Sequence, residues 1–160
     1  MTDIALRRDA LTGAIDLALQ DGGLATDDGL MTAILISLFT DARARADDVL
    51  PEAGADRRGW WGDAFGEDGD GIGSRLWLLE REKVTEATAL KARDIVTEAL
   101  GWLVRDGVVR ELDVQTMLVR PTGTNGSGAL AIAVTLSRPD GPARQRFDFV
   151  WDATARSFTA

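Results

Sequence analysis

Residues 57–66 read RRGWWGDAFG, and this stretch lies between two strongly helical segments of the chain. It holds two of the five tryptophans, one of the five phenylalanines and three glycines, in a connection where polar residues are usual. A tryptophan side chain is costly to expose and large enough to dominate a core or an interface. The sequence therefore predicts that this connection either folds back over the core or holds an aromatic anchor for a partner.

The segment before this stretch has the pattern of an amphipathic helix from about residue 28 to 46. Thr26-Asp27-Asp28 supplies capping side chains and negative charge at its start, and Arg43 and Arg45 place positive charge in its last turns. Pro51 follows the end of the pattern. The apolar positions that recur at helical spacing are Leu30, Ile34, Leu35, Leu38 and Phe39.

Two further helices are predicted after the aromatic stretch. Residues 74–79 favour a short helix, and residues 85–105 favour a longer one that ends at Asp106-Gly107. The connection from about residue 49 to 73 is long for a compact domain, and such connections are often functional. One face of the longer helix carries Ala89, Ala92, Val96, Ala99 and Leu103.

Three strands are predicted at residues 108–119, 129–137 and 144–151, and alternation is clearest in the second. Alternating residues at 4–6 and 15–19 predict a hairpin near the N-terminus. Strands and helices come in separate runs, which favours an α+β fold. We expect an antiparallel sheet of about five strands packed against two long helices and one short helix, in a single domain over residues 1–160.

The composition excludes several classes of function. The 18 basic and 26 acidic residues give a net charge of −8, which argues against nucleic-acid and membrane-surface partners. The absence of cysteine and histidine removes disulfides, thiolate sites and Ser-His-Asp catalysis. No apolar run approaches the ~20 residues that span a bilayer, and no signal peptide is evident. We expect the protein to be made and used in the cytoplasm, at least initially.

Two acidic groups were weighed as chemical sites. Asp68-Gly69-Asp70-Gly71 fits only part of a calcium-loop pattern, because the fifth position is Ile72 and the twelfth is Leu79. Four carboxylates could supply a catalytic pair for glycoside hydrolysis, but sequence spacing sets neither their separation nor a raised pKa. We therefore predict no metal, no cofactor and no catalytic residue. The four carboxylates are Asp63, Glu67, Glu80 and Glu82.

The two arginines beside the tryptophan pair favour an interface. Arg57 and Arg58 could stack on indoles or pair with acids, and Trp and Arg are enriched at binding hot spots. In the alternative, Trp60 and Trp61 fill the space between the helices while the arginines stay solvated. We expect at least one of the two indoles to be mainly core, and the other could face a partner because adjacent side chains diverge.

The chain resembles the small baseplate protein of Mu-like contractile phage tails, over nearly its whole length. The resemblance rests on an Asp-Ile-Ala-Leu start, Leu24-Ala25-Thr26-Asp27-Asp28-Gly29-Leu30, Arg58-Gly59-Trp60-Trp61-Gly62-Asp63, and Gly73-Ser74-Arg75-Leu76-Trp77. The Gly-Trp-Trp-Gly-Asp segment is its most specific part. This family is similar to the small wedge protein of T-even phages and to its counterpart in type VI secretion, which carry a lysozyme-like label.

The resemblance implies a structural role in the baseplate wedge of a phage or prophage tail. Such a protein binds a larger wedge subunit and presents a sheet edge that helps to start sheath assembly. A strand such as residues 144–151 could add to a neighbour's sheet. The larger wedge protein and the tail sheath protein are thus expected partners, and a homo-oligomer of the isolated chain stays open. The alternative functions are a peptidoglycan glycosidase and a regulator or adaptor encoded with the tail genes.

The resemblance also bears on which residues make the contact. The wider wedge family has a Glu-Pro-Arg triplet after its long helix, and only Arg105 could correspond to it here. The aromatic stretch could take over that contact in this branch. The predicted interface residues are Arg57, Arg58, Trp60, Trp61, Asp63 and Arg105.

Overall fold

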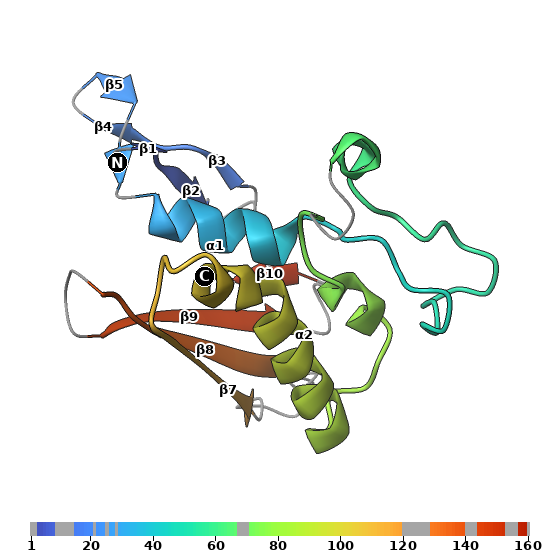
Figure 1. Ribbon diagram of the computed structural model, residues 1–160. Helices are drawn as coiled ribbons and strands as arrows, with labels where there is room; N and C mark the ends of the chain where they lie inside the picture. The colour runs from blue at the N-terminus through green and yellow to red at the C-terminus, as the bar shows by residue number, and fades with distance from the viewer. Residues whose placement is uncertain are drawn as a thin grey trace.

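The computed structural model arranges the chain in layers (Figure 1). A sheet forms one side, helix α2 lies on it, helix α1 lies beside α2, and short N-terminal strands lie along the far side of α1. The class is α+β, because helices and strands stay in separate runs. The structure describes residues 3–8, 15–20, 22–24, 26–27, 29–66, 71–119, 129–139, 144–152 and 157–159.

The main sheet has four antiparallel strands in the order β10-β9-β8-β7. Every second residue of β8 is buried, as the alternation in the sequence predicted. Val134 lies in register between Val114 and Phe147 and faces the helices with them. The strands are β7 (Glu111–Val119), β8 (Ala129–Ser137), β9 (Gln145–Asp152) and β10 (Ser157–Thr159).

The long helix α2 (Glu86–Arg105) matches its prediction to within one residue. Thr85 caps it, because its hydroxyl oxygen accepts a hydrogen bond from the Thr88 amide at 3.2 Å. The Thr116 hydroxyl of β7 donates to the Ala89 carbonyl at 2.9 Å and ties the helix to the sheet. The buried face of α2 carries Ala89, Ala92, Val96, Leu100 and Leu103.

The core lies between the two helices and the sheet. Ile34 of α1, Val96 of α2 and Ile132 of β8 belong to one buried cluster. Phe39 meets Phe149 of β9 edge to face, with ring centroids 5.7 Å apart. Among the described residues, no helix has the length and apolarity needed to cross a bilayer.

The prediction of a single five-stranded sheet is wrong. The N-terminal strands do form antiparallel ladders, but these are three separate two-stranded pairs, β1-β6, β2-β3 and β4-β5. Strands β2 and β6 contact α1, and the three pairs leave the main sheet to β7–β10. The short strands are β1 (Asp3–Ile4), β2 (Leu6–Arg8), β3 (Ile15–Leu17), β4 (Leu19–Gln20), β5 (Gly23–Leu24) and β6 (Thr26–Asp27).

The helix predicted over residues 28–46 is also wrong in its bounds, because α1 covers only Leu30–Phe39. Its N-cap is Gly29, in the left-handed region at φ 80°, and no side chain caps it. After Thr40 the backbone is extended, so Arg43 and Arg45 do not lie in a helical turn. Residues 42 and 44 use their amides to bind distant segments, and this tertiary pairing overrides local helix propensity.

The short helix predicted at 74–79 is a single 3₁₀ turn, η2, over Leu76–Leu79. A second 3₁₀ turn, η1, covers Trp61–Phe65 in the aromatic stretch, where no helix was predicted. The predicted helix therefore exists only as one turn, and the aromatic stretch has a turn of its own. The structure thus has two α-helices in its described residues, rather than the three that were predicted.

Candidate protein-protein interface

The connection between α1 and α2 is held in place by backbone hydrogen bonds at several points. The Ser74 amide donates to the Thr40 carbonyl, and the Ala42 amide donates to the Ser74 carbonyl, each at 2.9 Å. The Ala44 amide donates to the Arg57 carbonyl, also at 2.9 Å. The Ser74 hydroxyl donates to the Leu38 carbonyl at 2.6 Å. These bonds bring residues 40–44, 57 and 74 together and give the connection a defined shape.

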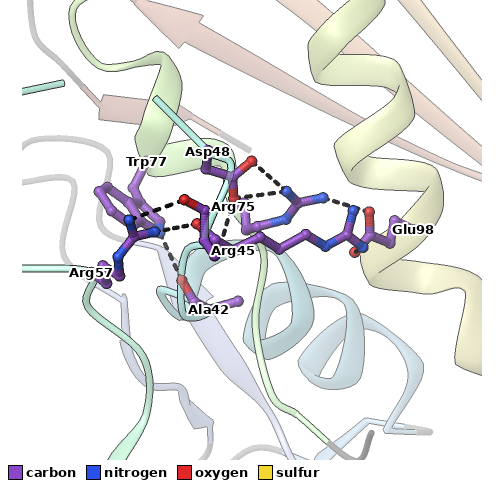
Figure 2. Close-up of polar contacts among 8 residues, drawn as sticks. Ala42, Arg45, Asp48, Arg57, Arg75, Trp77 and Glu98 are labelled. Carbon is purple, nitrogen blue, oxygen red and sulfur yellow. Dashed lines mark hydrogen bonds and ion pairs between the residues drawn. The ribbon is translucent and has the colours of Figure 1, made fainter. Parts of the chain in front are cut away.

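A network of ion pairs fastens the same connection to α2 (Figure 2). One nitrogen of Arg75 donates to both carboxylate oxygens of Asp48, at 2.8 and 2.9 Å, and the other donates to Glu98 at 2.7 Å. Arg45 donates to the second oxygen of Glu98 at 2.7 Å. Its own amide donates to Asp48, also at 2.7 Å. Charge-assisted hydrogen bonds of this kind are shorter and stronger than neutral ones.

Asp48 and Arg75 are the partly buried members of this network, and both have shifted pKa values. Burial alone would raise the pKa of Asp48, but the hydrogen bonds from Arg75 and from the Arg45 amide lower it below its ordinary value. Burial alone would lower the pKa of Arg75, and the bonds to Asp48 and Glu98 raise it. Both groups are therefore held in their charged forms.

The two predicted interface arginines turn toward the body of the protein. Arg57 donates to the carbonyl of Arg45 and, at 3.2 Å, to that of Ala46; Figure 2 shows Arg57 pointing toward Arg45. The Arg57 side chain therefore holds the backbone of residues 45–46 next to residue 57. This contact gives Arg57 a structural role.

Arg58 is bound still more closely. Its guanidinium donates to Asp41 at 2.8 Å and to both oxygens of Glu80 at 3.0 and 3.1 Å. The hydrogen bond with Glu80 raises the pKa of Arg58, against burial, and the bond with Asp41 raises it further. The same group lies over the ring of Trp77, with Cζ 4.5 Å from the centroid. Trp77 is therefore the buried indole that an arginine of this stretch contacts.

The tryptophan pair, by contrast, is exposed. Trp60 is 41% exposed and Trp61 75%, and Phe65 at the end of η1 is 83% exposed. The rings of Trp60 and Trp61 lie 5.6 Å apart, and Phe65 meets Trp61 edge to face at 6.1 Å. The expectation that one of the two indoles is mainly core is wrong. We call Trp60, Trp61 and Phe65 the aromatic cluster.

Glycines allow the aromatic cluster to form. A Cβ on Gly62 would lie 2.2 Å from the Trp60 ring, so only glycine lets the indole fold over this position. Gly59 has φ 108°, and a Cβ there would lie 2.8 Å from the Cβ of Arg43. The Gly-Trp-Trp-Gly pattern thus sets both the sharp turn before the pair and the packing of the first ring.

Asp63 and Arg105 lie apart from the arginine pair. Asp63 accepts a hydrogen bond from the Ile72 amide at 3.1 Å and so closes η1 against residues 71–72. Arg105, at the end of α2, is exposed and contacts the neighbouring Asp106 at 3.3 Å. Both residues line an open groove between α1 and α2, whose volume is about 940 Å³.

The six predicted interface residues therefore divide into three groups. Trp60 and Trp61 belong to the exposed cluster, Arg57 and Arg58 hold the connection, and Asp63 and Arg105 line the groove. Sequence reasoning did not select Phe65 for this site, although its spacing of four from Trp61 would place the two rings on one side of a helical turn.

Three of the four carboxylates considered for catalysis have structural partners in the described part of the chain. Asp63 binds the Ile72 amide, and Glu80 binds Arg58. Glu82 accepts bonds from Lys91 at 2.6 Å and from the Thr88 hydroxyl at 3.4 Å. Glu67 and the Asp68-Gly69-Asp70 segment lie outside the described residues. Within those residues, no group of three or more acidic side chains is arranged to hold a metal ion.

Comparison with known proteins identifies the family. Residues 30–143 match the family described as phage protein GP46. The chain belongs to this family. It is 44% identical over 142 residues to the baseplate protein gp46 of Escherichia phage Mu, across 88% of this chain and 90% of that protein. It is 37% identical over 146 residues to the Mu-like prophage FluMu protein gp46 of Haemophilus influenzae, across 91% and 94% respectively.

The predicted resemblance to the small baseplate protein of Mu-like phages is thereby confirmed. The relation to the wedge proteins of T-even phages and type VI secretion stays a prediction. The GP46 match begins at Leu30, the first residue of α1, and ends just before β9. It therefore contains the aromatic cluster, the ion-pair network and the groove, whereas the N-terminal strands lie outside it.

Proposed function

We propose that the chain, acting as a single domain, is a structural component of the baseplate wedge in a contractile phage or prophage tail. Its relatives of similar length include a protein named as a baseplate protein. In this proposal the chain folds in the host cytoplasm, joins a larger wedge subunit during assembly and remains in the tail baseplate of the virion.

The observation that carries this proposal is the aromatic cluster. Trp61 and Phe65 keep most of their surface in water, at a substantial hydrophobic cost that burial in a partner would recover. The connection that carries them is fixed by Arg57, Arg58 and Arg75, so little conformational entropy is lost when a partner covers the rings. Large aromatic side chains on a rigid support are typical of binding hot spots.

The sheet also bears on the proposed sheath contact. The strand at residues 144–151 was expected to add to a neighbour's sheet, but β9 pairs with β8 on one side and β10 on the other. The edges of the main sheet are β7 and β10. We therefore propose that any added strand from the tail sheath pairs with one of these two.

Co-expression with the larger wedge subunit tests the proposal. The tagged chain should co-purify with that subunit, and a Trp60→Ala, Trp61→Ala, Phe65→Ala triple variant should lose it. A matched control is Leu90→Ala, since Leu90 is another exposed apolar side chain, on α2. Each variant is first checked for wild-type circular dichroism. A folded triple variant that still co-purifies and still enters tails would contradict the role given to the aromatic cluster.

Three further measurements test the function and the oligomeric state. Absence of the wild-type chain from purified tails would contradict the baseplate role. In isolation, we expect the aromatic cluster to favour a concentration-dependent homo-oligomer that the triple variant does not form, which analytical ultracentrifugation can measure. Lysis of cell walls that depends on Asp63 would instead support the glycosidase alternative.

A further inference from the structure

A second surface of the chain adjoins the aromatic cluster. The α1–α2 groove runs between the two helices, and Asp63 and Ile72 form one of its walls. Asp63 belongs to η1, the turn that also carries Trp61 and Phe65. The groove and the aromatic cluster are therefore neighbouring parts of one face. The helix residues that line the groove include Ala33, Ile36, Ser37, Ile95, Ala99 and Trp102.

The lining of the groove suits close contact with the apolar face of another helix. Ala33, Ser37 and Ala99 are small, so another helix could approach closely. The only polar group of Trp102, its ring N–H, already donates to the Ser37 hydroxyl at 3.0 Å. Ile36 is exposed although it belongs to the otherwise buried α1, and it faces this groove. The floor therefore offers apolar contact with little unsatisfied polarity.

The charges around the groove differ from those of the chain as a whole. Four arginines and three carboxylates line it in the described residues, in a protein whose net charge is −8. Arg45 and Arg75 are held by Glu98 and Asp48. Arg43 and Arg105 make weaker contacts.

Arg43 donates to the Arg58 carbonyl at 3.4 Å, a long and weak bond. Arg105 contacts only the adjacent Asp106 in the described residues, at 3.3 Å and in an exposed position. Such contacts add little stability and are easily exchanged for better ones. Two guanidiniums at the groove can therefore pair with carboxylates that a partner brings.

We infer that the α1–α2 groove binds an acidic amphipathic helix of the larger wedge subunit. This inference rests on the proposed function and extends it to the second surface. A helix about 10 Å wide would fill the volume over roughly eight residues, or two turns. Small and apolar residues of that helix face Ala33, Ile36 and Ala99, and its carboxylates face Arg43 and Arg105.

Geometry and charge argue against the other occupants. A second copy of this chain would have to offer a helix to the groove, whereas α1 and α2 both already form its walls. A nucleic acid would meet the carboxylates of Asp63, Glu98 and Asp106 at the groove. A helix, unlike a uniform polyanion, can place its carboxylates beside Arg43 and Arg105 while its apolar face meets Ile36.

Charge reversal at the groove is the first test, with the purified larger wedge subunit as the probe. An Arg43→Glu, Arg105→Glu double variant should bind about tenfold more weakly, since it replaces two attractive contacts by repulsive ones. The matched control is Arg93→Glu, Arg146→Glu, which makes the same charge change at two exposed arginines outside the groove. The control should stay within about twofold of wild type.

Ile36→Glu is the second test, because it places a carboxylate on the apolar floor at an exposed position. It should weaken binding by at least about tenfold. Leu90→Glu, at an exposed apolar position of α2 outside the groove, should not. A photo-crosslinker at position 36 should then attach to a helix of the larger subunit that carries aspartate or glutamate.

The outcomes separate this inference from the proposed function. If the wild-type chain does not bind the larger subunit, the proposed function is wrong and the groove inference fails with it. If the wild type binds and the groove variants bind equally well, only the groove inference is wrong. Attachment from position 36 to a basic segment, or to a second copy of this chain, would also overturn it.

Discussion

The guanidinium of Arg58 lies over the indole of Trp77, 4.5 Å from its centroid, and so joins the aromatic stretch to the protein body. The arginine comes from the segment expected to face a partner, whereas the indole is only 5% exposed. The ring N–H of Trp77 donates to the Ala42 carbonyl at 2.8 Å, on the same extended segment that Arg57 closes. The contact between Arg58 and Trp77 thus fixes the position of the aromatic cluster on the protein surface.

Arg58→Ala should lower the free energy of unfolding by about 1–2 kcal/mol, through loss of the cation–π contact and of two half-exposed ion pairs. For a chain of this size the melting temperature should fall by about 4 °C. Arg81→Ala is the control, because its pair with Glu52 is exposed on both sides, and it should change stability by less than about 0.5 kcal/mol. Equal losses in the two variants would contradict the role of Trp77 as the stacking partner of Arg58.

Gly73→Ala should be far more destabilising than Gly54→Ala. Both glycines have positive φ, 103° and 77°, so both substitutions carry backbone strain. Only at Gly73 would the new Cβ meet backbone, at 2.3 Å from the Thr40 carbonyl oxygen, whereas Gly54 has open space. We expect the Gly73 variant to lose about 2–3 kcal/mol more in urea denaturation. A smaller loss at Gly73 than at Gly54 would contradict this prediction. It would show that the hydrogen-bonded contact between residues 40 and 74 can shift at little cost in free energy.

The elements that were predictable from sequence are those specified by their own periodicity. Helix α2 has a capping threonine and a regular apolar face, and β8 alternates over its whole length. The end of α1 was not predictable, because residues 42–44 are good helix formers and their sequence favours continuation of the helix. Their backbone is extended only because Ser74 and Arg57, far along the chain, take up its hydrogen bonds.

The site was predictable in its residues but not in their roles. The sequence indicated that the Arg-Arg-Gly-Trp-Trp stretch matters, yet the partners of Arg58 lie 17 and 22 residues away. No local pattern relates Arg58 to Asp41 or Glu80. Local reasoning also predicts a buried indole, since large apolar side chains are rarely left exposed together on a surface. The small groove residues became visible only once α1 and α2 were placed side by side.

The pH dependence of stability should report on Asp48. Its pKa lies below the ordinary 3.8 in the folded state, so between the two values the unfolded chain binds more protons at this carboxyl. The ion pair's contribution is therefore present above pH 3.8 and is lost as the pH falls through the lower folded-state pKa. Asp48→Asn should cost about 2 kcal/mol at pH 7, because Arg75 loses a buried charged partner.

The difference between wild type and Asp48→Asn should shrink as the pH falls below about 4, measured by urea denaturation at several pH values. Asp94→Asn is the control, since its pair with Arg93 is exposed and should matter little at any pH. A difference that stays constant down to pH 2 would contradict the assignment of Asp48 as the titrating partner of Arg75.

Trp77→Ala should lower the free energy of unfolding, whereas Trp61→Ala should weaken partner binding and leave stability nearly unchanged. Trp77 is buried, so its truncation should cost about 3–4 kcal/mol in urea denaturation. Trp61 is 75% exposed, so its truncation should change stability by less than about 0.5 kcal/mol while weakening co-purification with the larger wedge subunit. This expectation follows from the proposal that a partner covers the surface of Trp61. A Trp61 variant that loses stability but keeps its partner would show that this indole serves the fold of the chain itself.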